Sequence, residues 1–585
     1  MQGCDHLQQF HLRFISIDRV TATTSVKVFS IEEATVYDLQ HAFQRNQLTS
    51  RQLVEFYLKQ IHKLNPILKG VLEINPDALA QADKADQERT TRAKAPPGSF
   101  SWLHGMPILL KDNIATKDKL NTTSGSFALL GSVVPRDAGV VTKLRKAGAI
   151  ILGKATMSEW SHSRSNGALN GWSARGGQGK NPYTMGDPCG SSSGSAISVA
   201  ANLVTVSLGT ETDASILCPS DYNSLVGIKP TVGLTSRAGV VPISPRQDTV
   251  GTVSDAAYVL ETIAGIDIND KATIKASHYV PKGGYSQFLK EDGLTGKRLG
   301  ILRYLFFDFG NDTFLHDTFE LHLNTLRQRG AVLIDNLKID NVDEILSDPS
   351  EFIALDFEFK LSLNAYLKDL VASPVRTLAD VIAFNEKHPK VEKLNDYGQD
   401  LLLDAQKTNG IGKRENQALL NMTRYSENGF VKLMITNKLD AVVVPGWSLS
   451  SILAVGGYPG VIVPAGYDNK GMPFGICFGG LKGSEPKLIE IAYSFEQATK
   501  IRKPPPLHQK LEPQISTDGS KAKKKSQQKV VLFITNVITN KFIAIIRITC
   551  IWPTGLALGG GASGQAFHPH LLWLGFDSQV YPIGS

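Results

Sequence analysis

A serine-rich segment, PCGSSSGSAISVAANLVTVSLGTETDASI at 188–216, is the first feature of this chain whose residue types could carry out chemistry. A serine hydroxyl is a weak nucleophile and needs a neighbouring base to take its proton. No histidine lies in this segment, so a lysine is the base to look for, as in Ser-Lys enzymes. Two questions follow: which serine reacts, and which lysine serves it.

One interpretation makes Ser192 the nucleophile, because Gly190–Gly194 matches G-x-S-x-G, the nucleophile elbow of α/β-hydrolases. An elbow requires a buried strand in front of it and an Asp and a His later in the chain. The preceding residues, KNPYTMGDPC at 180–189, are turn-forming and polar. The match is also short and falls in sequence rich in glycine and serine, so this interpretation is the weaker one.

A second interpretation places the nucleophile at Ser215. The apolar run LVTVSLG at 203–209 predicts a buried strand, which leads into the polar loop TETDAS at 210–215. Consecutive backbone N–H groups in such a loop can point at a developing oxyanion. The candidate base is Lys111, at the end of the apolar run MPILLK. Burial there could lower its pKa from about 10.4 to the roughly 7–8 that a base needs, although the strand alone fits a lysine whose head reaches solvent equally well.

The elements that would position these residues alternate between apolar runs and helical stretches. Strands are predicted at 106–111, 149–153, 203–209, 441–446 and 459–466, and helices at 138–147, 194–202 and 487–500. Residues 29–66 also read as helical, with Thr49 and Gln52 resembling a capping box. Residues 312–438 are mostly helical and could be an insert or a layer facing the substrate. This alternation predicts an α/β architecture with helices on both faces of a sheet.

The composition predicts a globular, mildly basic protein. The chain has 585 residues, 42% of them apolar, and a formal net charge of +7. Positive residues are scattered apart from one run at 521–525, so we expect no nucleic-acid binding. The five cysteines are few, odd in number and without metal-ligand spacing, so we expect neither a metal site nor a disulfide framework. Cys189, Cys218 and Cys477 are best interpreted as small buried side chains.

Three motifs together resemble the amidase signature family: GMPILLKDN at 105–113, CGSSSGSA at 189–196 and GTETDASI at 209–216, in that order. Twenty-four residues separate Ser191 from Ser215, as expected for the two catalytic serines of that family. The resemblance covers about residues 29–505 and is closest to the long amidases of plants and fungi, which are similar to fatty acid amide hydrolase and to amidotransferase A-subunit cores. It implies an α/β/α sandwich around a large mixed sheet.

The resemblance also implies a mechanism, the hydrolysis of a linear carboxamide through an acyl-enzyme. Ser215 would be the nucleophile, Ser191 the bridging serine and Lys111 the base of a Ser-Ser-Lys triad. The backbone N–H groups of Thr212, Asp213, Ala214 and Ser215 would form the oxyanion hole, and the Gly190–Ser191 bond would be cis. The substrate would be a small amide, and no metal or organic cofactor is implied. Ser192, Ser193 and Ser195 would then be structural, with hydroxyls bonded to their own backbone.

Two departures from the family pattern bear on activity. The residue before the nucleophile is Ala214, where the family usually has glycine. If this position needs φ > 0, alanine costs about 1–2 kcal/mol and could turn away an oxyanion donor, whose loss can cost about 10²–10³ in rate. The second departure is QDTVG at 247–251, which runs directly into TVSDAAYVL, whereas relatives carry a few more residues of the type PMAR. The following helix could therefore be displaced.

Two rival interpretations use the same fold. An ammonia-generating A-type subunit of a tRNA-dependent amidotransferase would need partner subunits, whereas a free-standing amidase would act as a monomer or homodimer. A pseudoenzyme would keep the fold as a binding scaffold. The intact Lys111, Ser191 and Ser215 argue against the pseudoenzyme, and Ala214 and the short segment at Gly251 argue for it.

The ends of the chain differ from the predicted catalytic domain at 29–505. Residues 1–28 lack the apolar core of a secretory signal peptide, which slightly favours a cytoplasmic protein. They are expected to be a poorly ordered extension. The tail, 506–585, contains an apolar stretch at 530–552 that is long enough to cross a bilayer. Because Lys541 and Arg547 lie inside that stretch, a membrane anchor is not expected.

Overall fold

The computed structural model describes residues 29–91, 100–253 and 255–507. The predicted N-terminal extension and all but the first two residues of the tail, including its apolar stretch at 530–552, lie outside these ranges. Within the described residues, no helix is long and apolar enough to span a bilayer.

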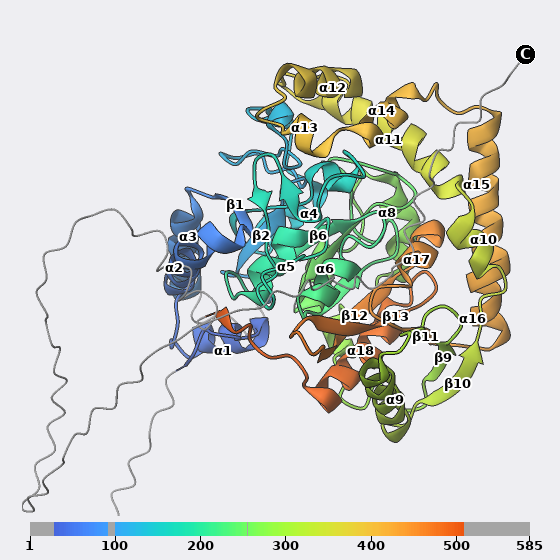
Figure 1. Ribbon diagram of the computed structural model, residues 1–585. Helices are drawn as coiled ribbons and strands as arrows, with labels where there is room; N and C mark the ends of the chain where they lie inside the picture. The colour runs from blue at the N-terminus through green and yellow to red at the C-terminus, as the bar shows by residue number, and fades with distance from the viewer. Residues whose placement is uncertain (1–28, 92–99, 254, 508–585) are drawn as a thin grey trace, which may run out of the picture. The chain divides into compact units, whose positions relative to one another are not determined.

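An eleven-stranded mixed sheet forms the centre of the fold, with strand order β1-β3-β2-β6-β8-β7-β12-β13-β11-β9-β10. Figure 1 shows β1 and β2 on one side of this sheet and β9 and β10 on the other. The strands, including a separate two-stranded ribbon of β4 and β5, are β1 Val71–Ile74, β2 Pro107–Lys111, β3 Ile150–Ala155, β4 Trp172–Ser173, β5 Gly177–Gln178, β6 Val206–Glu211, β7 Gly227–Lys229, β8 Thr249–Val253, β9 Arg298–Leu302, β10 Val332–Leu337, β11 Ala441–Pro445, β12 Gly460–Tyr467 and β13 Pro473–Gly479.

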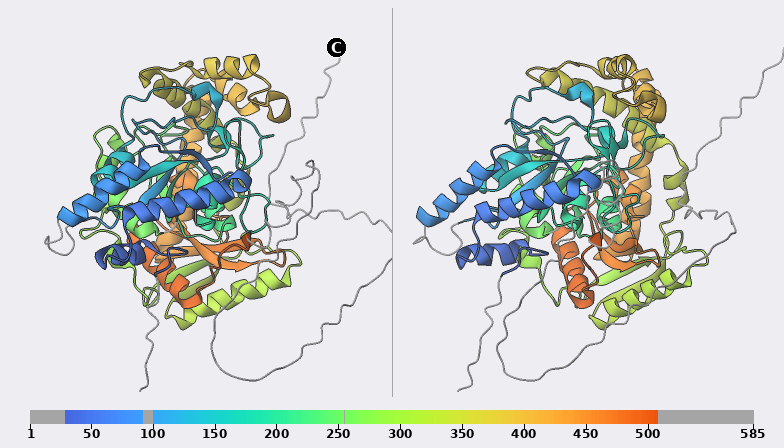
Figure 2. Two further views of the ribbon diagram at one scale, coloured as in Figure 1. Left: turned by 90° about the vertical axis from the view of Figure 1, so that its left-hand side faces the viewer. Right: turned by 60° about the vertical axis from the view of Figure 1, so that its left-hand side comes forward.

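Helices pack against this sheet, so the predicted α/β class is confirmed. Figure 2 shows α2 and α3 side by side next to the β1–β2 half. The helices are α1 Val36–Gln44, α2 Ser50–Leu68, α3 Ala78–Thr91, α4 Gly139–Lys146, α5 Ser193–Ala200, α6 Leu217–Tyr222, α7 Ala256–Ile263, α8 Lys271–Ala276, α9 Thr313–Gln328, α10 Val342–Ser347, α11 Ser350–Asp369, α12 Leu378–Lys387, α13 Leu394–Tyr397, α14 Asp400–Lys407, α15 Lys413–Ser426, α16 Lys432–Thr436, α17 Ser450–Gly456 and α18 Glu485–Thr499.

The predicted elements match closely where local signals are strong. At the start of α2, Gln52 N–H donates to Thr49 Oγ1 at 3.1 Å and Thr49 N–H donates to Gln52 Oε1 at 2.9 Å, which is the predicted capping box. The apolar runs at 106–111 and 203–209 correspond to the fully buried strands β2 and β6, although β6 begins at Val206 and continues through Thr210 and Glu211, which were expected in the loop. Both strands lack polar alternation because helices and neighbouring strands bury them on all sides.

The stretch at 312–438 is mostly helical, as predicted, but it also contains the strand β10. This strand pairs in parallel with β9 at the edge of the sheet, and its burial is only partial. Its sequence, VLIDNL, lacks the fully apolar character by which the central strands were recognised. Figure 1 shows α11, α12 and α14 above the sheet and α15 along its right-hand side.

The short segment at Gly251 is built into the sheet as the middle of β8. Residues Ser207 to Glu211 of β6 pair with β8 across this segment in antiparallel register. The helix α7 begins at Ala256, and its Val259, Leu260 and Ile263 are fully buried. The elements on both sides of the short segment, β8 and α7, are therefore packed.

Parallel pairing brings the candidate residues to one edge of the sheet. Strand β2 pairs in parallel with both β3 and β6. The carboxyl ends of these strands therefore lie together, and this is the edge at which α/β sheets place their ligands. Lys111 ends β2, and the loop at 212–215 follows β6.

Candidate active site

Lys111 lies at the end of β2 with its side chain completely buried. Its Nζ donates to Ser191 Oγ at 2.7 Å and to the carbonyl oxygen of Thr210 at 3.0 Å. A side chain whose head reaches solvent is therefore excluded for Lys111. The structure brings the predicted base and the predicted bridging serine into direct contact across 80 residues of sequence.

Burial decides the protonation of this lysine. Removal from water lowers the pKa of Lys111 to about 7, although the carboxylates of Glu211 and Asp248 act in the opposite direction. No carboxylate lies within ion-pair distance of Lys111 in the described part of the chain. A substantial fraction of Lys111 is therefore neutral near pH 7, so its amine can accept a proton from a serine hydroxyl.

Ser191 stands just before α5, and the Gly190–Ser191 peptide bond is cis, as the resemblance implied. A Cβ at Gly190 would collide with Ser158 Oγ, so any larger residue here would force the Ser158 side chain to move. Ser191 is fully buried, and its carbonyl oxygen accepts the N–H of Ser158 at 3.1 Å. Ser158 therefore packs against both residues of this bond.

Ser215 lies in the loop after β6, 8% exposed. The N–H of Ser192 donates to the carbonyl oxygen of Ser215 at 3.2 Å, so the loops of the two candidate serines are in direct contact. The Ser215 hydroxyl donates to the carbonyl oxygen of Asp213 at 3.2 Å. The described residues show no hydrogen bond between the Ser215 and Ser191 hydroxyls, which the implied triad requires.

The loop from Thr212 to Ala214 is half-buried. The backbone N–H groups of Thr212, Asp213 and Ser215 have no backbone acceptor among the described residues. Unpaired N–H groups in a partly desolvated loop are suited to binding an oxyanion. A small cavity beside this loop is lined by residues that include Asn113, Thr210 and Thr212.

Glu211, which sequence reasoning missed, holds the chain behind Ser215. Its Oε2 accepts the N–H groups of Ile216 and Leu217 at 2.6 and 2.9 Å. Burial raises the pKa of Glu211 to about 7, and the nearby Lys229 partly lowers it. The only sequence signal for a role of Glu211 was its position inside the GTETDASI motif. The fold shows in addition that its side chain turns back toward α6.

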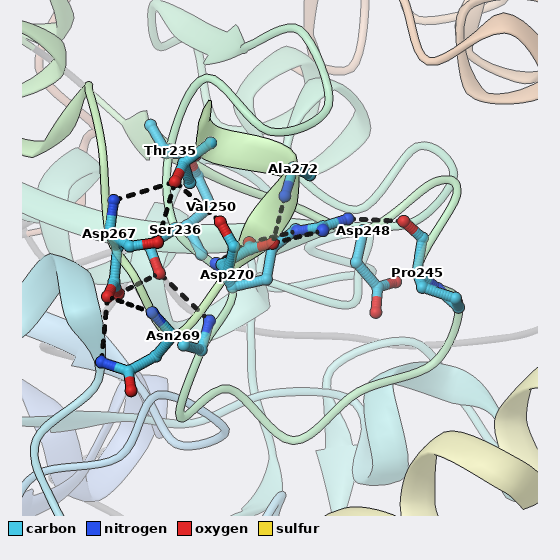
Figure 3. Close-up of polar contacts among 12 residues, drawn as sticks. Thr235, Ser236, Pro245, Asp248, Val250, Asp267, Asn269, Asp270 and Ala272 are labelled. Carbon is cyan, nitrogen blue, oxygen red and sulfur yellow. Dashed lines mark hydrogen bonds and ion pairs between the residues drawn. The ribbon is translucent and has the colours of Figure 1, made fainter. Parts of the chain in front are cut away.

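Asp248 supports the same loop from the other side. Its Oδ1 accepts the Thr212 hydroxyl at 2.7 Å, and its Oδ2 accepts the N–H groups of Ile243 and Ser244 at 2.8 and 3.0 Å. Figure 3 shows Asp248 near Pro245. Because 36 residues separate Asp248 from Thr212, the sequence carried no local signal for this contact.

Arg237 fastens the loop that carries Asp248. Its guanidinium pairs with both carboxylate oxygens of Asp270, at 2.7 and 2.8 Å, and donates to the carbonyl oxygen of Pro245 at 2.5 Å. Figure 3 labels the two acceptors, Asp270 and Pro245, with dashed lines to each. A bidentate arginine-carboxylate pair is geometrically restrictive, so the loop at 237–248 presents Asp248 in a defined position.

The other serines of the run make structural contacts. Ser192 Oγ donates to the carbonyl oxygen of Thr210 at 3.1 Å, Ser193 Oγ to that of Cys189 at 2.7 Å and Ser195 Oγ to that of Leu208 at 2.9 Å. No strand leads directly into Gly190, because residues 181–190 form turns and irregular chain. Ser192 therefore does not stand on a nucleophile elbow.

The expectation that the cysteines form no disulfide is wrong. Cys189 and Cys218 are bonded to each other, with a Cα–Cα distance of 5.9 Å. They are 29 residues apart in sequence, and only the contact between the Ser191 loop and α6 brings them together. Cys477 is free and buried, as expected. The described residues contain no cluster of three or more side chains that could hold a metal ion.

Ala214 adopts a left-handed conformation, with φ +59°. The cost expected for alanine at such a position therefore applies. We predict that Ala214→Gly stabilises the protein by about 0.5–1 kcal/mol, because relief of the left-handed strain exceeds the entropy that glycine adds to the unfolded chain. Thermal or urea unfolding would measure this.

The matched control is Ala147→Gly, because Ala147 is the C-cap residue after α4 and has an ordinary φ of −75°. That variant should be less stable than the wild type by about 0.4–1 kcal/mol, because glycine adds entropy to the unfolded chain. If both variants lost stability equally, the strain at Ala214 would be disproved.

The lowered pKa of Lys111 also predicts that the stability of the protein depends on pH. This pKa is lower in the folded than in the unfolded protein, so between pH 7 and 10 the unfolded chain binds more protons. Relative to Lys111→Met, the wild type should therefore gain up to about 1.4 kcal/mol of unfolding free energy per pH unit over this range. Parallel melting curves of the two proteins would test this; a constant difference between pH 7 and 10 would contradict the lowered pKa.

Comparisons with known proteins identify the family of this chain. The family model described as Amidase matches residues 52–489. "Probable amidase At4g34880" of Arabidopsis thaliana is 60% identical over 484 residues, covering 82% of this chain and 92% of the relative. The A-type subunit of the glutamyl-tRNA(Gln) amidotransferase of Thermoanaerobacter pseudethanolicus is 29% identical over 517 residues, covering 80% of this chain and 97% of the relative.

A solved structure has the same fold. The native peptide amidase of Stenotrophomonas maltophilia superposes with a TM-score of 0.75 and 41% identity, covering 81% of this chain and 98% of that one. With a buried lysine on a serine hydroxyl and a family match over most of the described residues, the chain belongs to the amidase signature family.

Proposed function

We propose that this amidase hydrolyses a linear carboxamide to a carboxylate and ammonia or an amine, through an acyl-enzyme on Ser215. The observation that carries the proposal is the 2.7 Å hydrogen bond from the buried Lys111 to Ser191 Oγ. A lysine that titrates near pH 7 on a serine hydroxyl is poised to move a proton rather than to hold a fixed charge.

The first step requires the Ser215 hydroxyl to turn from Asp213 to Ser191. Ser191 then takes the proton of Ser215 while it passes its own proton to Lys111. The Ser215 oxygen attacks the amide carbon, and the resulting oxyanion is held by the N–H groups of the loop at 212–215. Lys111 returns the proton through Ser191 to the leaving nitrogen, and the C–N bond breaks. Water then hydrolyses the acyl-enzyme by the same relay.

The relatives support an amide substrate and a free-standing enzyme. This chain is 41% identical to a peptide amidase, so amides of amino acids and short peptides are the first substrates to screen. It is only 29% identical to the amidotransferase relative. A stable complex with other proteins on purification would favour the amidotransferase role, whereas a lone monomer or homodimer that releases ammonia would support the amidase.

The central test is covalent labelling with a fluorophosphonate followed by peptide mapping. We expect an adduct on Ser215, and Ser215→Ala should lose both labelling and at least about 10³-fold in turnover. Ser192→Ala is the control, because Ser192 donates to the backbone and should retain most activity. An adduct on Ser192 would refute the assignment, and no adduct on folded protein would favour a pseudoenzyme.

The pH profile tests the base. Because Lys111 must be neutral to accept a proton, kcat/KM should rise with pH through a pKa near 7. The Asp248 carboxylate raises the pKa of Lys111, so Asp248→Asn should move this rising limb about 0.5–1 pH unit lower. An asparagine amide can donate to Thr212 while its oxygen accepts the two N–H groups, so the loop contacts can persist. An unmoved limb would exclude Lys111 as the titrating base.

A further inference from the structure

The disulfide between Cys189 and Cys218 closes the chain next to both candidate serines. Cys189 stands two residues before Ser191, and Cys218 stands three residues after Ser215. The covalent path from one serine to the other is therefore short through the sulfur atoms. Along the backbone the same two serines are separated by α5 and β6.

Each half of the crosslink is firmly placed in its own segment. The N–H of Cys189 donates to Asp187 Oδ1 at 2.7 Å, and its carbonyl oxygen accepts the Ser193 hydroxyl at 2.7 Å. The N–H of Cys218 donates to the carbonyl oxygen of Ala214 at 2.8 Å. Both cysteines are buried, with 6% and 1% exposure. A shift of either sulfur is thus passed directly to a serine loop.

Hydrogen bonds also join the two serine loops on the side of Ser191 that faces away from Cys189. There, the N–H of Ser192 donates to Ser215 and its hydroxyl donates to Thr210. On the side of Cys189, the Asn223 amide bridges the carbonyl oxygens of Pro188 and Pro219, at 2.9 and 2.7 Å. The disulfide adds a covalent link to this second side, so Ser191 is held from both directions.

We propose that Cys189 and Cys218 are positioning residues, whose disulfide sets the geometry between Ser191 and Ser215, so that turnover requires the oxidised pair. This inference rests on the proposed function, because it concerns proton transfer between those two serines. Proton relays tolerate little displacement: a misplacement of about 1 Å can cost 10²-fold in rate. The crosslink acts on the reacting hydroxyls without touching substrate, so its loss lowers kcat and leaves KM nearly unchanged.

Reduction is a two-electron step. A dithiol such as dithiothreitol supplies two electrons and two protons, the S–S bond breaks, Cys189 and Cys218 become thiols, and the reductant closes into its cyclic disulfide. Because both sulfur atoms are buried, complete reduction has to be verified by alkylation and peptide mapping before activity is measured.

The experiment compares the full-length oxidised protein, the reduced protein and Cys189→Ala, Cys218→Ala and double variants. Ammonia release from a peptide amide gives kcat and KM, and circular dichroism at the assay temperature verifies folding. We expect kcat to fall about 10- to 100-fold on reduction and in every variant, with KM within about twofold. The double variant should be insensitive to dithiothreitol. Cys477→Ala, which removes the free buried thiol, should behave as the wild type and remain sensitive.

Two results would overturn the inference. One is an unchanged kcat in folded protein whose Cys189 and Cys218 are shown to be thiols. The other is a loss of thermal stability without a loss of kcat, which would mean that the crosslink serves the fold only. If the variants fail to fold, the reduced wild type decides between these results. Absence of turnover by the oxidised wild type would instead remove the proposed function, and this inference with it.

Discussion

The desolvation of one ammonium group is the constraint on which this site depends. Lys111 is fully buried and hydrogen-bonds to a hydroxyl and a carbonyl rather than to a carboxylate. Burial without a paired charge favours the neutral amine, which is the form that can accept a proton. Two other lysines are also fully buried and bonded to neutral oxygens: Lys154 donates to Thr122 and Ile114, and Lys229 to Tyr458. Lys111 differs from them in its partner, because Ser191 lies in a loop that contacts the loop of Ser215.

The parallel pairing of β2 and β6 places the buried lysine next to the loop that carries Ser215. Because the two strands lie side by side and run in one direction, the residue that ends β2 meets the loop that leaves β6. Glu211 and Asp248 then hold that loop from opposite sides, through backbone N–H groups and through the Thr212 hydroxyl. Their negative charges partly offset the desolvation of Lys111. The same carboxylates thus stabilise the loop and keep the pKa of the lysine from falling further.

The Ser215 loop contains a backbone conformation that is energetically unfavourable for its residue type. Ala214 occupies a left-handed conformation that glycine would adopt more readily, and yet the loop keeps N–H groups without backbone acceptors. The hydrogen bonds that the N–H groups of Ile216 and Leu217 donate to Glu211, and the Cys189–Cys218 disulfide, surround this strained residue. A conformation of this kind persists only where neighbouring contacts over-determine it. The site is therefore more constrained than a surface loop rich in serine would be.

The sequence by itself determined the α/β class, the buried strands at 106–111 and 203–209, and the family to which the chain belongs. Apolar periodicity and motif order are local properties, which a single chain displays directly. Tertiary structure alone decided that Lys111 is buried rather than solvated, that Asp248 reaches Thr212, that β10 joins the sheet and that Cys189 bonds to Cys218. Each of these depends on contacts between segments distant in sequence. Burial and pairing are set by which surfaces the fold brings together, and no local pattern of residues encodes that choice.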